Sequence, residues 1–330
     1  LWANVGGQRL EKTSREPFPK TPWGSMVAAV IDFENDGHQD LILTDIKSDM
    51  SEEVGPNREK LKAEMKWDEE MLRSGGKSIW GNAFFRGLGN GRFEEVSDKI
   101  GAENYWPWGL STGDLNADGF TDAFIAASMN FPFRYGVNSL LLNDGGTRFA
   151  DAEFILGVEP RRDGRTAKPW FKLDPTGEDR GHALVKRYKL DKPVEVWGAL
   201  GTRSSAVFDI EGDGDLDIVT NEFHDGPMVL LSNLSERRGI RWLKVKLVGS
   251  ESNRDGLGAV VEVVAGGKTY QQVNDGLTGY LSHGLLPLYF GIGTADAVDS
   301  LRVRWPSGRV SALEAVGVNS TVEVVEGGGG

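Results

Sequence analysis

Short apolar runs that alternate with polar turns dominate the chain. Three pairs of these runs each enclose an acidic stretch, and they cover residues 25–31 and 41–43, 109–113 and 123–125, and 204–208 and 218–220. Apolar runs of this length that are bounded by Gly, Asn and Asp are typical of β-strands. We therefore expect each acidic stretch to be a loop that joins two strands.

Further strands and glycine turns follow these pairs. The segments 83–93 and 140–149 read as strand, Gly-rich turn and strand, and 229–233 reads as the same strand without a clear return. Residues 2–10 fit the second half of such a unit. Four antiparallel strands per repeat form the unit of a β-propeller blade, so the pattern predicts an all-β chain of propeller blades.

The number of repeats raises a question of closure. The chain supplies three repeats and the second half of one more, whereas a ring needs at least about four blades. Either the irregular segment before the third repeat forms a further blade, or upstream blades complete the ring. Half a blade leaves a strand edge unpaired, and uncovered blade faces leave apolar surface exposed, which destabilises the folded state. We therefore expect this chain to be the C-terminal part of a longer polypeptide and of a larger ring.

Two insertions separate the repeats by more than the roughly 40–60 residues of a bare blade. The first covers about 48–78, and its middle (57–73) is an amphipathic helix pattern that Gly75–Gly76 ends. The second covers about 159–199 and mixes basic and aromatic residues. Such insertions lie on a propeller face and often carry binding specificity, although one that covers a blade edge is the alternative.

The pattern changes at Ile240. Six short strands with turns between them follow, and they predict a small β-sandwich or barrel. The predicted domains are therefore propeller blades over 1–239, a second β domain over 240–326, and a glycine tail over 327–330.

The acidic loops share a spacing of oxygen-bearing side chains at positions 1, 3, 5 and 9, with Gly at position 6. Calcium takes about six to eight oxygen ligands, and alternate positions of a tight loop turn towards one point. Position 7 would offer its backbone carbonyl. The candidate ligands of the predicted Ca²⁺ sites are Asp32, Glu34, Asp36, His38 and Asp40 (loop 1), Asp114, Asn116, Asp118, Phe120 and Asp122 (loop 2), and Asp209, Glu211, Asp213, Asp215 and Asp217 (loop 3).

These loops resemble the first half of an EF-hand loop without its final glutamate, since Leu43, Ile125 and Thr220 stand at position 12. An acidic, solvated hairpin turn would have a similar composition. Three copies with the same spacing and the same flanks favour the metal-binding interpretation, with calcium in all three loops.

Composition excludes several classes of protein. The net charge is −12, which the twelve carboxylates of the three loops account for. The chain has no basic region suited to nucleic acid and no apolar run long enough for a membrane span. It contains no cysteine, so disulfides, thiolate catalysis and cysteine-based zinc sites are excluded.

The three loops with their flanks resemble FG-GAP, or VCBS-type, propeller repeats. The C-terminal part resembles the ASPIC/UnbV domain, through residues 252–259, 279–282, 290–293 and 303–308. These resemblances imply a secreted, periplasmic or cell-surface protein of the cartilage-acidic-protein-like group. The chain departs from the family pattern at Glu34 and Glu211, where Asp or Asn is more usual, and at His283, where Gln is usual.

Candidate catalytic groups are few. Of the four histidines, only His224 beside Asp225 and His182 after Asp179 stand near a carboxylate outside the loops. We therefore favour a calcium-binding extracellular scaffold or adhesion protein that binds protein or glycan, or self-assembles. A flat aromatic face around Trp170 and Trp197 would support it. The alternative is a carbohydrate lyase or hydrolase with a site on the propeller face. A tight cleft around His182 or His224, with a strongly shifted histidine pKa, would support this alternative.

Overall fold

The computed structural model describes residues 2–13, 17–18, 20–22, 24–46, 78–79, 81–104, 106–128 and 135–328. The helix expected over 57–73, with most of the first insertion, lies outside these residues. The described part is almost entirely β-structure, and its short helices are α2 (Ser97–Ile100), η4 (Glu178–Gly181), α3 (Ala183–Tyr188) and α4 (Leu234–Arg237).

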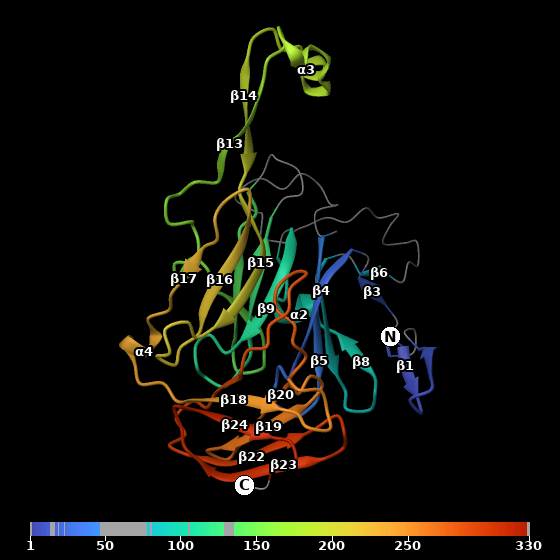
Figure 1. The fold of residues 1–330 in the computed structure, drawn as a ribbon, viewed down its shortest axis with the longest axis vertical. Helices are drawn as coiled ribbons and strands as arrows, with labels where there is room; N and C mark the ends of the chain where they lie inside the picture. The colour runs from blue at the N-terminus through green and yellow to red at the C-terminus, as the bar shows by residue number, and fades with distance from the viewer. Residues whose placement is uncertain are drawn as a thin grey trace.

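Three antiparallel sheets form the propeller blades (Figure 1). The first two have four strands each, in chain order, and the third has three described strands, after which α4 follows. The first blade is β4 (Ser25–Ile31), β5 (Asp40–Asp45), β7 (Ala83–Gly87) and β8 (Phe93–Glu95); the second is β9 (Pro107–Gly113), β10 (Asp122–Ala127), β11 (Ser139–Asn143) and β12 (Phe149–Asp151); the third is β15 (Gly201–Phe208), β16 (Asp217–Phe223) and β17 (Val229–Leu230). The predicted all-β propeller architecture is confirmed.

The blades pack face to face through apolar side chains. Strand β9 lies between β4 and β15, so the first strands of the three blades are neighbours. Phe33 packs edge-on against Phe84 and Phe149, with ring centroids 5.1 and 4.9 Å apart, and joins the first two blades. Every residue of β10 is buried, because this strand lies in the middle blade and between two strands of its own sheet.

The first residues form a separate hairpin of β1 (Trp2–Val5) and β2 (Arg9–Lys12), which pair with each other. In the described part of the chain neither strand pairs with another sheet. Strand β3 (Thr21–Pro22) makes a short parallel pair with β6 (Ser78–Ile79). Phe18 stacks on Phe93, with ring centroids 4.6 Å apart, and so anchors this N-terminal region to the first blade.

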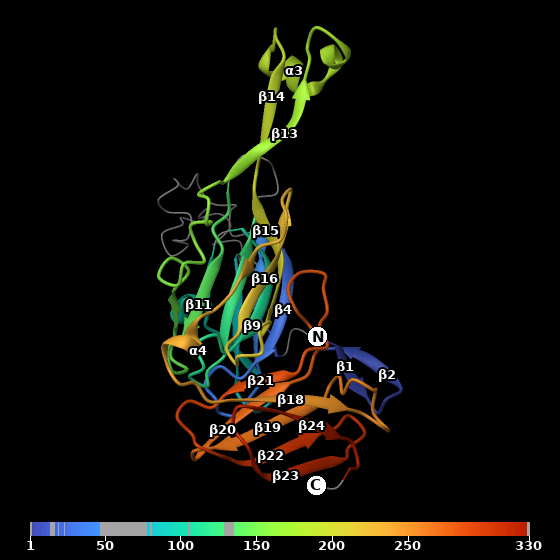
Figure 2. The ribbon, with the colours of Figure 1, turned by 60° about the vertical axis from the view of Figure 1, so that its left-hand side comes forward.

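The second insertion forms an arm. Strands β13 (Ala167–Leu173) and β14 (Val194–Ala199) pair antiparallel, and η4 and α3 lie between them at the tip. Figures 1 and 2 show this hairpin projecting along the long axis, away from the rest of the molecule. The insertion therefore forms a two-stranded arm rather than the four-stranded further blade that was one expectation. Leu173 and Val185 are buried at the tip and give it a small core of its own.

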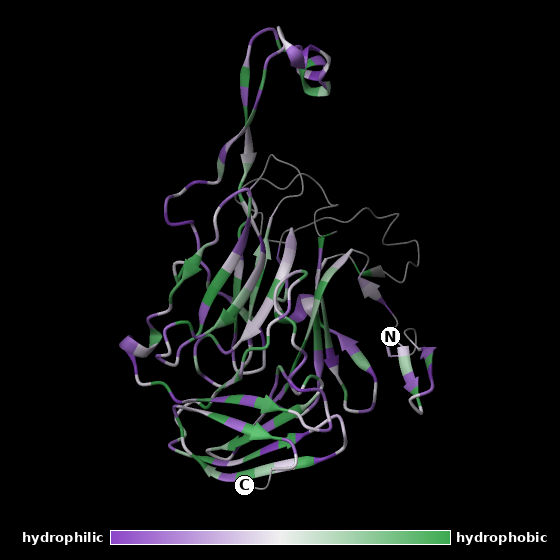
Figure 3. Ribbon diagram, in the orientation of Figure 1, coloured by the Kyte–Doolittle hydropathy of each residue, from purple (hydrophilic) through white to green (hydrophobic). Residues whose placement is uncertain are grey.

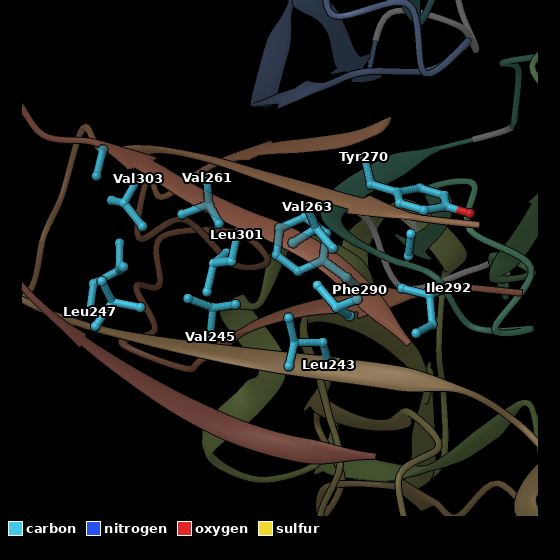
Figure 4. Close-up of a cluster of buried hydrophobic side chains, with 14 of the residues drawn as sticks. Leu243, Val245, Leu247, Val261, Val263, Tyr270, Phe290, Ile292, Leu301 and Val303 are labelled. Atoms are coloured by element: carbon cyan, nitrogen blue, oxygen red, sulfur yellow. The ribbon is translucent and has the colours of Figure 1, made fainter. Parts of the chain in front are cut away.

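The C-terminal domain is a β-sandwich, which is one of the two architectures expected from the sequence, a sandwich or a barrel. One sheet contains β21 (Leu288–Gly291), β18 (Trp242–Val248) and β24 (Ser320–Val325), with β18 and β24 parallel; the other contains β20 (Lys268–Val273), β19 (Val260–Ala265), β22 (Val298–Arg304) and β23 (Val310–Val316). Hydrophobic and polar positions alternate along these strands (Figure 3). Figure 4 shows the result, a core in which Leu243, Val245 and Leu247 face the side chains of the opposite sheet.

Candidate metal-binding loops between the two domains

All three acidic loops lie at the same end of the propeller. Each joins the first two strands of its blade: loop 1 (32–40) joins β4 to β5, loop 2 (114–122) joins β9 to β10, and loop 3 (209–217) joins β15 to β16. The loops meet the C-terminal sandwich at this end (Figure 1). The fold thereby brings Asp32 and Asp217, which are 185 positions apart in sequence, to one layer of the molecule.

Backbone hydrogen bonds fold each loop around its first and ninth carboxylates. In loop 1, Asp32 accepts hydrogen bonds from the amides of Asp36 (3.0 Å) and Gly37 (2.9 Å). Asp40 accepts from the amide of Phe33 (2.8 Å) inside the loop and from that of Gly87 (2.7 Å) on β7. The ninth residue thus ties the loop to the third strand of its blade.

Loop 2 repeats this arrangement. Asp114 accepts hydrogen bonds from the amides of Asp118 (3.0 Å) and Gly119 (2.8 Å). Asp122 accepts from the amides of Leu115 (2.8 Å) and Asn143 (2.7 Å), and Asn143 lies on β11, the third strand. The shared pattern explains why the same acids recur at the same spacing.

Glycine is required at position 6 for a backbone reason. Gly37, Gly119 and Gly214 have φ angles of 83°, 94° and 99°. Side chains with a Cβ rarely adopt these values, so another residue would be strained there. The expectation that this glycine permits the sharp bend is met in all three loops.

The carboxylates of loops 1 and 2 lie where their charge is penalised. Burial raises the pKa of Asp32 to about 6 and, together with the nearby Asp40, raises the pKa of Glu34 to about 7. Burial and the neighbouring Asp118 raise the pKa of Asp114 to about 7. Burial also places the pKa of Asp122 well above its usual range. Carboxylates in such surroundings are stabilised by a nearby cation.

The donor set of loops 1 and 2 fits a hard divalent cation such as Ca²⁺. One carboxylate oxygen of Glu34, Oε2, is buried and has no hydrogen-bond partner among the described residues, although the other oxygen pairs with Arg86. Oxygen-only, anionic and partly buried ligands are those that calcium prefers. In the described chain no three His, Asp or Glu side chains form a ready-made metal-binding group.

Loop 3 differs because a lysine from the second domain reaches it. The Lys244 ammonium pairs with Asp209 Oδ2. Burial works to raise the pKa of Asp209, but the hydrogen bonds from Lys244 and from backbone amides outweigh it and hold that pKa below its usual value. At position 7, where only a carbonyl was expected, the Asp215 side chain is buried, and in the part of the chain that the structure describes its Oδ1 has no hydrogen-bond partner.

Two family models match parts of the chain. The FG-GAP-like repeat model matches residues 71–125, a stretch that contains loop 2, and the ASPIC and UnbV model matches residues 249–330. The chain is an FG-GAP-type propeller followed by an ASPIC/UnbV domain. A comparison with curated proteins found no match. The ASPIC/UnbV sandwich itself starts before the matched residues, because β18 is the central strand of one of its sheets.

The ASPIC/UnbV domain touches every acidic loop of the propeller. The Gln271 amide donates to Gly37 O in loop 1 (3.3 Å). In loop 2, a Cβ at Gly119 would come within 2.5 Å of the Tyr270 ring, which shows how closely the two surfaces fit. Tyr289 donates to Gly214 O in loop 3 (2.8 Å). Sequence reasoning missed these partners, since nothing in the spacing of the acids points to a strand that follows them in the chain.

The segment between β20 and β21 extends the contact along the innermost strands. The amide of Gly279 donates to Leu110 O on β9 (2.9 Å), and the amide of Tyr280 donates to Ser204 Oγ on β15 (2.8 Å). The Tyr280 ring also packs edge-on against Trp108, with ring centroids 5.4 Å apart. The stretch 279–282, which carries part of the family resemblance, is thus a docking element. A cavity of about 380 Å³ lies beside it, lined by both domains.

The two candidate catalytic constellations have structural roles. His182 Nδ1 accepts a hydrogen bond from the Leu184 amide (3.2 Å) and caps α3. Asp225 accepts from Lys168 Nζ (3.0 Å), and this hydrogen bond is the main cause that lowers the pKa of Asp225. The His224 ring packs against Trp170, with ring centroids 5.7 Å apart. Neither histidine forms a hydrogen bond to the carboxylate that suggested it.

The aromatic residues of the arm do not share one face. Trp170 covers Gly198, where a Cβ would lie 3.4 Å from the indole. Trp197 precedes Gly198 on β14, and successive residues of a strand point to opposite faces. The indoles are half exposed, at 41% for Trp170 and 53% for Trp197. The flat face around both tryptophans is therefore not formed, and the arm presents an aromatic residue on each side.

Proposed function

We propose that this chain is a calcium-binding scaffold of the cell exterior, in which acidic loops join a propeller to an ASPIC/UnbV domain and exposed surfaces bind a protein or a glycan, or further copies of the chain. The observation that carries the proposal is the buried, raised-pKa carboxylate set of loops 1 and 2, clamped by backbone amides. An FG-GAP-like repeat is typical of extracellular or surface proteins, which supports the location. In the described residues no helix is long and apolar enough to cross a membrane.

The calcium proposal is tested by stability. A calcium site of the extracellular type binds with a dissociation constant of roughly 10⁻⁴–10⁻³ M. At a hundredfold excess of calcium over this constant, each site would stabilise the folded state by about 2.7 kcal/mol. For a domain of this size that corresponds to a rise in melting temperature of about 5–10 °C per site.

The experiment compares thermal melts of the metal-stripped protein in chelator, in excess Ca²⁺ and in excess Mg²⁺. We expect a clear rise with Ca²⁺, reversed by chelator, and a smaller rise with Mg²⁺, which demands a stricter octahedral geometry. Elemental analysis of the dialysed protein gives the bound ions directly. A melt that does not change between chelator and calcium, with no metal in the protein, would falsify the proposal.

The arm supports the binding part of the proposal. It projects from the body and exposes Trp197 and Tyr188. Between residues 167 and 199 it carries seven Lys or Arg against five Asp or Glu, whereas the whole chain has a net charge of −12. Exposed aromatic and basic side chains on an element that packs little against its own domain are typical of interaction surfaces. The contacts of His182 and Asp225 give the lyase or hydrolase alternative no comparable support.

A further inference from the structure

Loop 3 is the acidic loop with a cation supplied by the other domain. Lys244 lies on β18 of the ASPIC/UnbV domain, and its ammonium contacts the same Asp209 oxygen that accepts a hydrogen bond from the Gly214 amide (2.8 Å). The Asp209 side chain is fully buried and that of Lys244 is 15% exposed. Because both charged groups have lost most of their contact with water, removing either one would leave the other as an uncompensated, largely buried charge.

Neighbouring aromatic side chains fix the lysine and the loop together. The Lys244 ammonium lies 4.6 Å from the centroid of the Trp242 ring, a distance at which the ring face attracts a cation. Trp242 packs so closely on Gly214 that a Cβ there would clash with the indole. Tyr289, which is the register partner of Lys244 on β21, donates to Gly214 O (2.8 Å). Two adjacent strands of the ASPIC/UnbV domain, β18 and β21, therefore contact loop 3 of the propeller.

Among the residues that the structure describes, no such cation reaches the first carboxylate of loop 1 or loop 2. The ASPIC/UnbV domain contacts loop 1 through the neutral Gln271 and loop 2 through Tyr270. In the described residues neither Asp32 nor Asp114 forms an ion pair with a lysine or arginine. The three loops share a backbone design, but among the described residues a basic side chain pairs with the carboxylate at position 1 only in loop 3.

We propose that Lys244 is the resident cation of loop 3: its ammonium neutralises Asp209 and latches the ASPIC/UnbV domain to the third blade, so that calcium is needed at loops 1 and 2 alone. The calcium part of this inference rests on the proposed function, and the latch does not. An ammonium beside a carboxylate repels a divalent cation at that carboxylate. Removing Lys244 should therefore weaken the joint and at the same time open loop 3 to calcium.

The latch is tested without metal, by a cycle of thermal melts in excess chelator. Lys244→Met and Asp209→Asn should each lower the melting temperature, because each leaves a buried partner without its counter-charge. The double variant should lose less than the sum of the two. Lys246→Met is the matched control, two residues along the same strand, since its ion pair with Glu323 is more than half exposed. Strict additivity of the two single losses would overturn the latch.

The calcium part is tested by counting ions after equilibrium dialysis in excess calcium. We expect two ions per chain for the unchanged protein and for Lys246→Met, and three for Lys244→Met. Asp209→Asn should still bind two, which provides a second reading if the lysine variant fails to fold. Three ions in the unchanged protein, or a loss of one ion in Asp209→Asn, would overturn this part. Calcium in none of these proteins would instead overturn the proposed function, while the metal-free cycle still decides the latch.

Discussion

Asp118, the fifth residue of loop 2, uses both carboxylate oxygens within the loop. Oδ1 accepts a hydrogen bond from the Phe120 amide (2.9 Å), and Oδ2 accepts one from the Asn116 side chain (3.0 Å). Asp118→Ala removes these bonds and a candidate calcium ligand. We expect a loss of about 1–3 kcal/mol in the free energy of unfolding, in the usual range for a damaging substitution, and one bound ion fewer. Urea denaturation and elemental analysis measure the two effects.

Asp144→Ala is the control for this substitution. Asp144 is exposed and forms an ion pair with the exposed Arg148, so its loss should change stability by no more than about 0.5 kcal/mol. An Asp118→Ala protein that matched this control in stability and retained every ion would show that Asp118 is not a ligand.

Glu326 ties together three separate turns of the ASPIC/UnbV domain. Its carboxylate accepts hydrogen bonds from the backbone amides of Ser250 and Ser252 (2.7 Å each) and from the Ser307 hydroxyl. Burial works to raise the pKa of Glu326, but these hydrogen bonds outweigh it and lower the pKa to about 2. The folded state therefore favours the ionised form of Glu326, and the negative charge of this side chain contributes to the stability of the fold.

The pH dependence of Glu326→Gln follows from that shift. The contribution of Glu326 is fully present above about pH 4.3, the usual value for an unfolded glutamate. It is lost as the pH falls through about 2. We expect Glu326→Gln to melt below the unchanged protein at pH 7 and the gap to narrow once the pH drops below 4. The exposed Glu323→Gln is the control, and a gap that stays constant from pH 7 to 3 would contradict the prediction.

At this scale the sequence predicted the acids but not their partners. The spacing of Asp114, Asp118 and Asp122 is a local property of one loop, so it can be read from the chain. Lys244 lies on an alternating strand, where its charge indicates a solvent-facing position. Its side chain is only 15% exposed because the sandwich packs against loop 3, and no local pattern reveals that packing.

Among the elements, the arm is the one built most independently. Its tip has its own buried residues, Leu173 and Val185, and at its base Lys168 bonds to Asp225 and Trp170 packs against His224. Arg161, which precedes the arm, forms a buried ion pair with Glu222 on β16. We therefore expect the outer part of the arm to contribute little to the stability of the blades.

A shortened arm tests that independence. Lys172 and Glu195 are register partners, so residues 173–194 can be replaced by an Asn-Gly turn between them. We expect the melting temperature and the calcium content to stay close to those of the full chain, because the acidic loops lie at the end of the propeller that faces the C-terminal sandwich, away from the arm. Thermal melts, elemental analysis and sedimentation of both proteins make the comparison. A shortened chain that lost cooperative unfolding would show that the arm supports the blades.

Element prediction succeeded where a repeat guided it. The strand–loop–strand units were expected three times and are observed three times. The strand β23 (Val310–Val316) was not expected, because Leu313, Glu314 and Ala315 favour a helix. The arm has no repeat, and a bulge between Pro169 and Phe171 interrupts the alternation that would have indicated a strand.

For the whole molecule, the decisive feature is that the sandwich closes the loop end of the propeller. The presence of two β domains could be predicted from the change of pattern at Ile240. Their arrangement could not, because it depends on contacts such as Tyr289 with Gly214 that join residues far apart in sequence. The docking segment shows the same limit: Tyr280 and Gly279 were noted as part of a family motif, but their partners lie on β9 and β15.

Gly279 allows the most direct test of this joint. Its φ is +60°, and a Cβ there would lie 2.5 Å from Ser205 O and 2.7 Å from Ser205 N, which belong to the backbone of β15 and cannot move aside. Gly279→Val should therefore displace the docking segment and reduce the free energy of unfolding by about 2–4 kcal/mol, through overpacking and backbone strain. Hydrogen exchange should speed up at the amides of 279 and 280, whose bonds to Leu110 and Ser204 are lost. Gly226→Val, at a site with open space and ordinary φ, should leave both measurements unchanged. Unaltered exchange in Gly279→Val would mean that the two domains are held together without this segment.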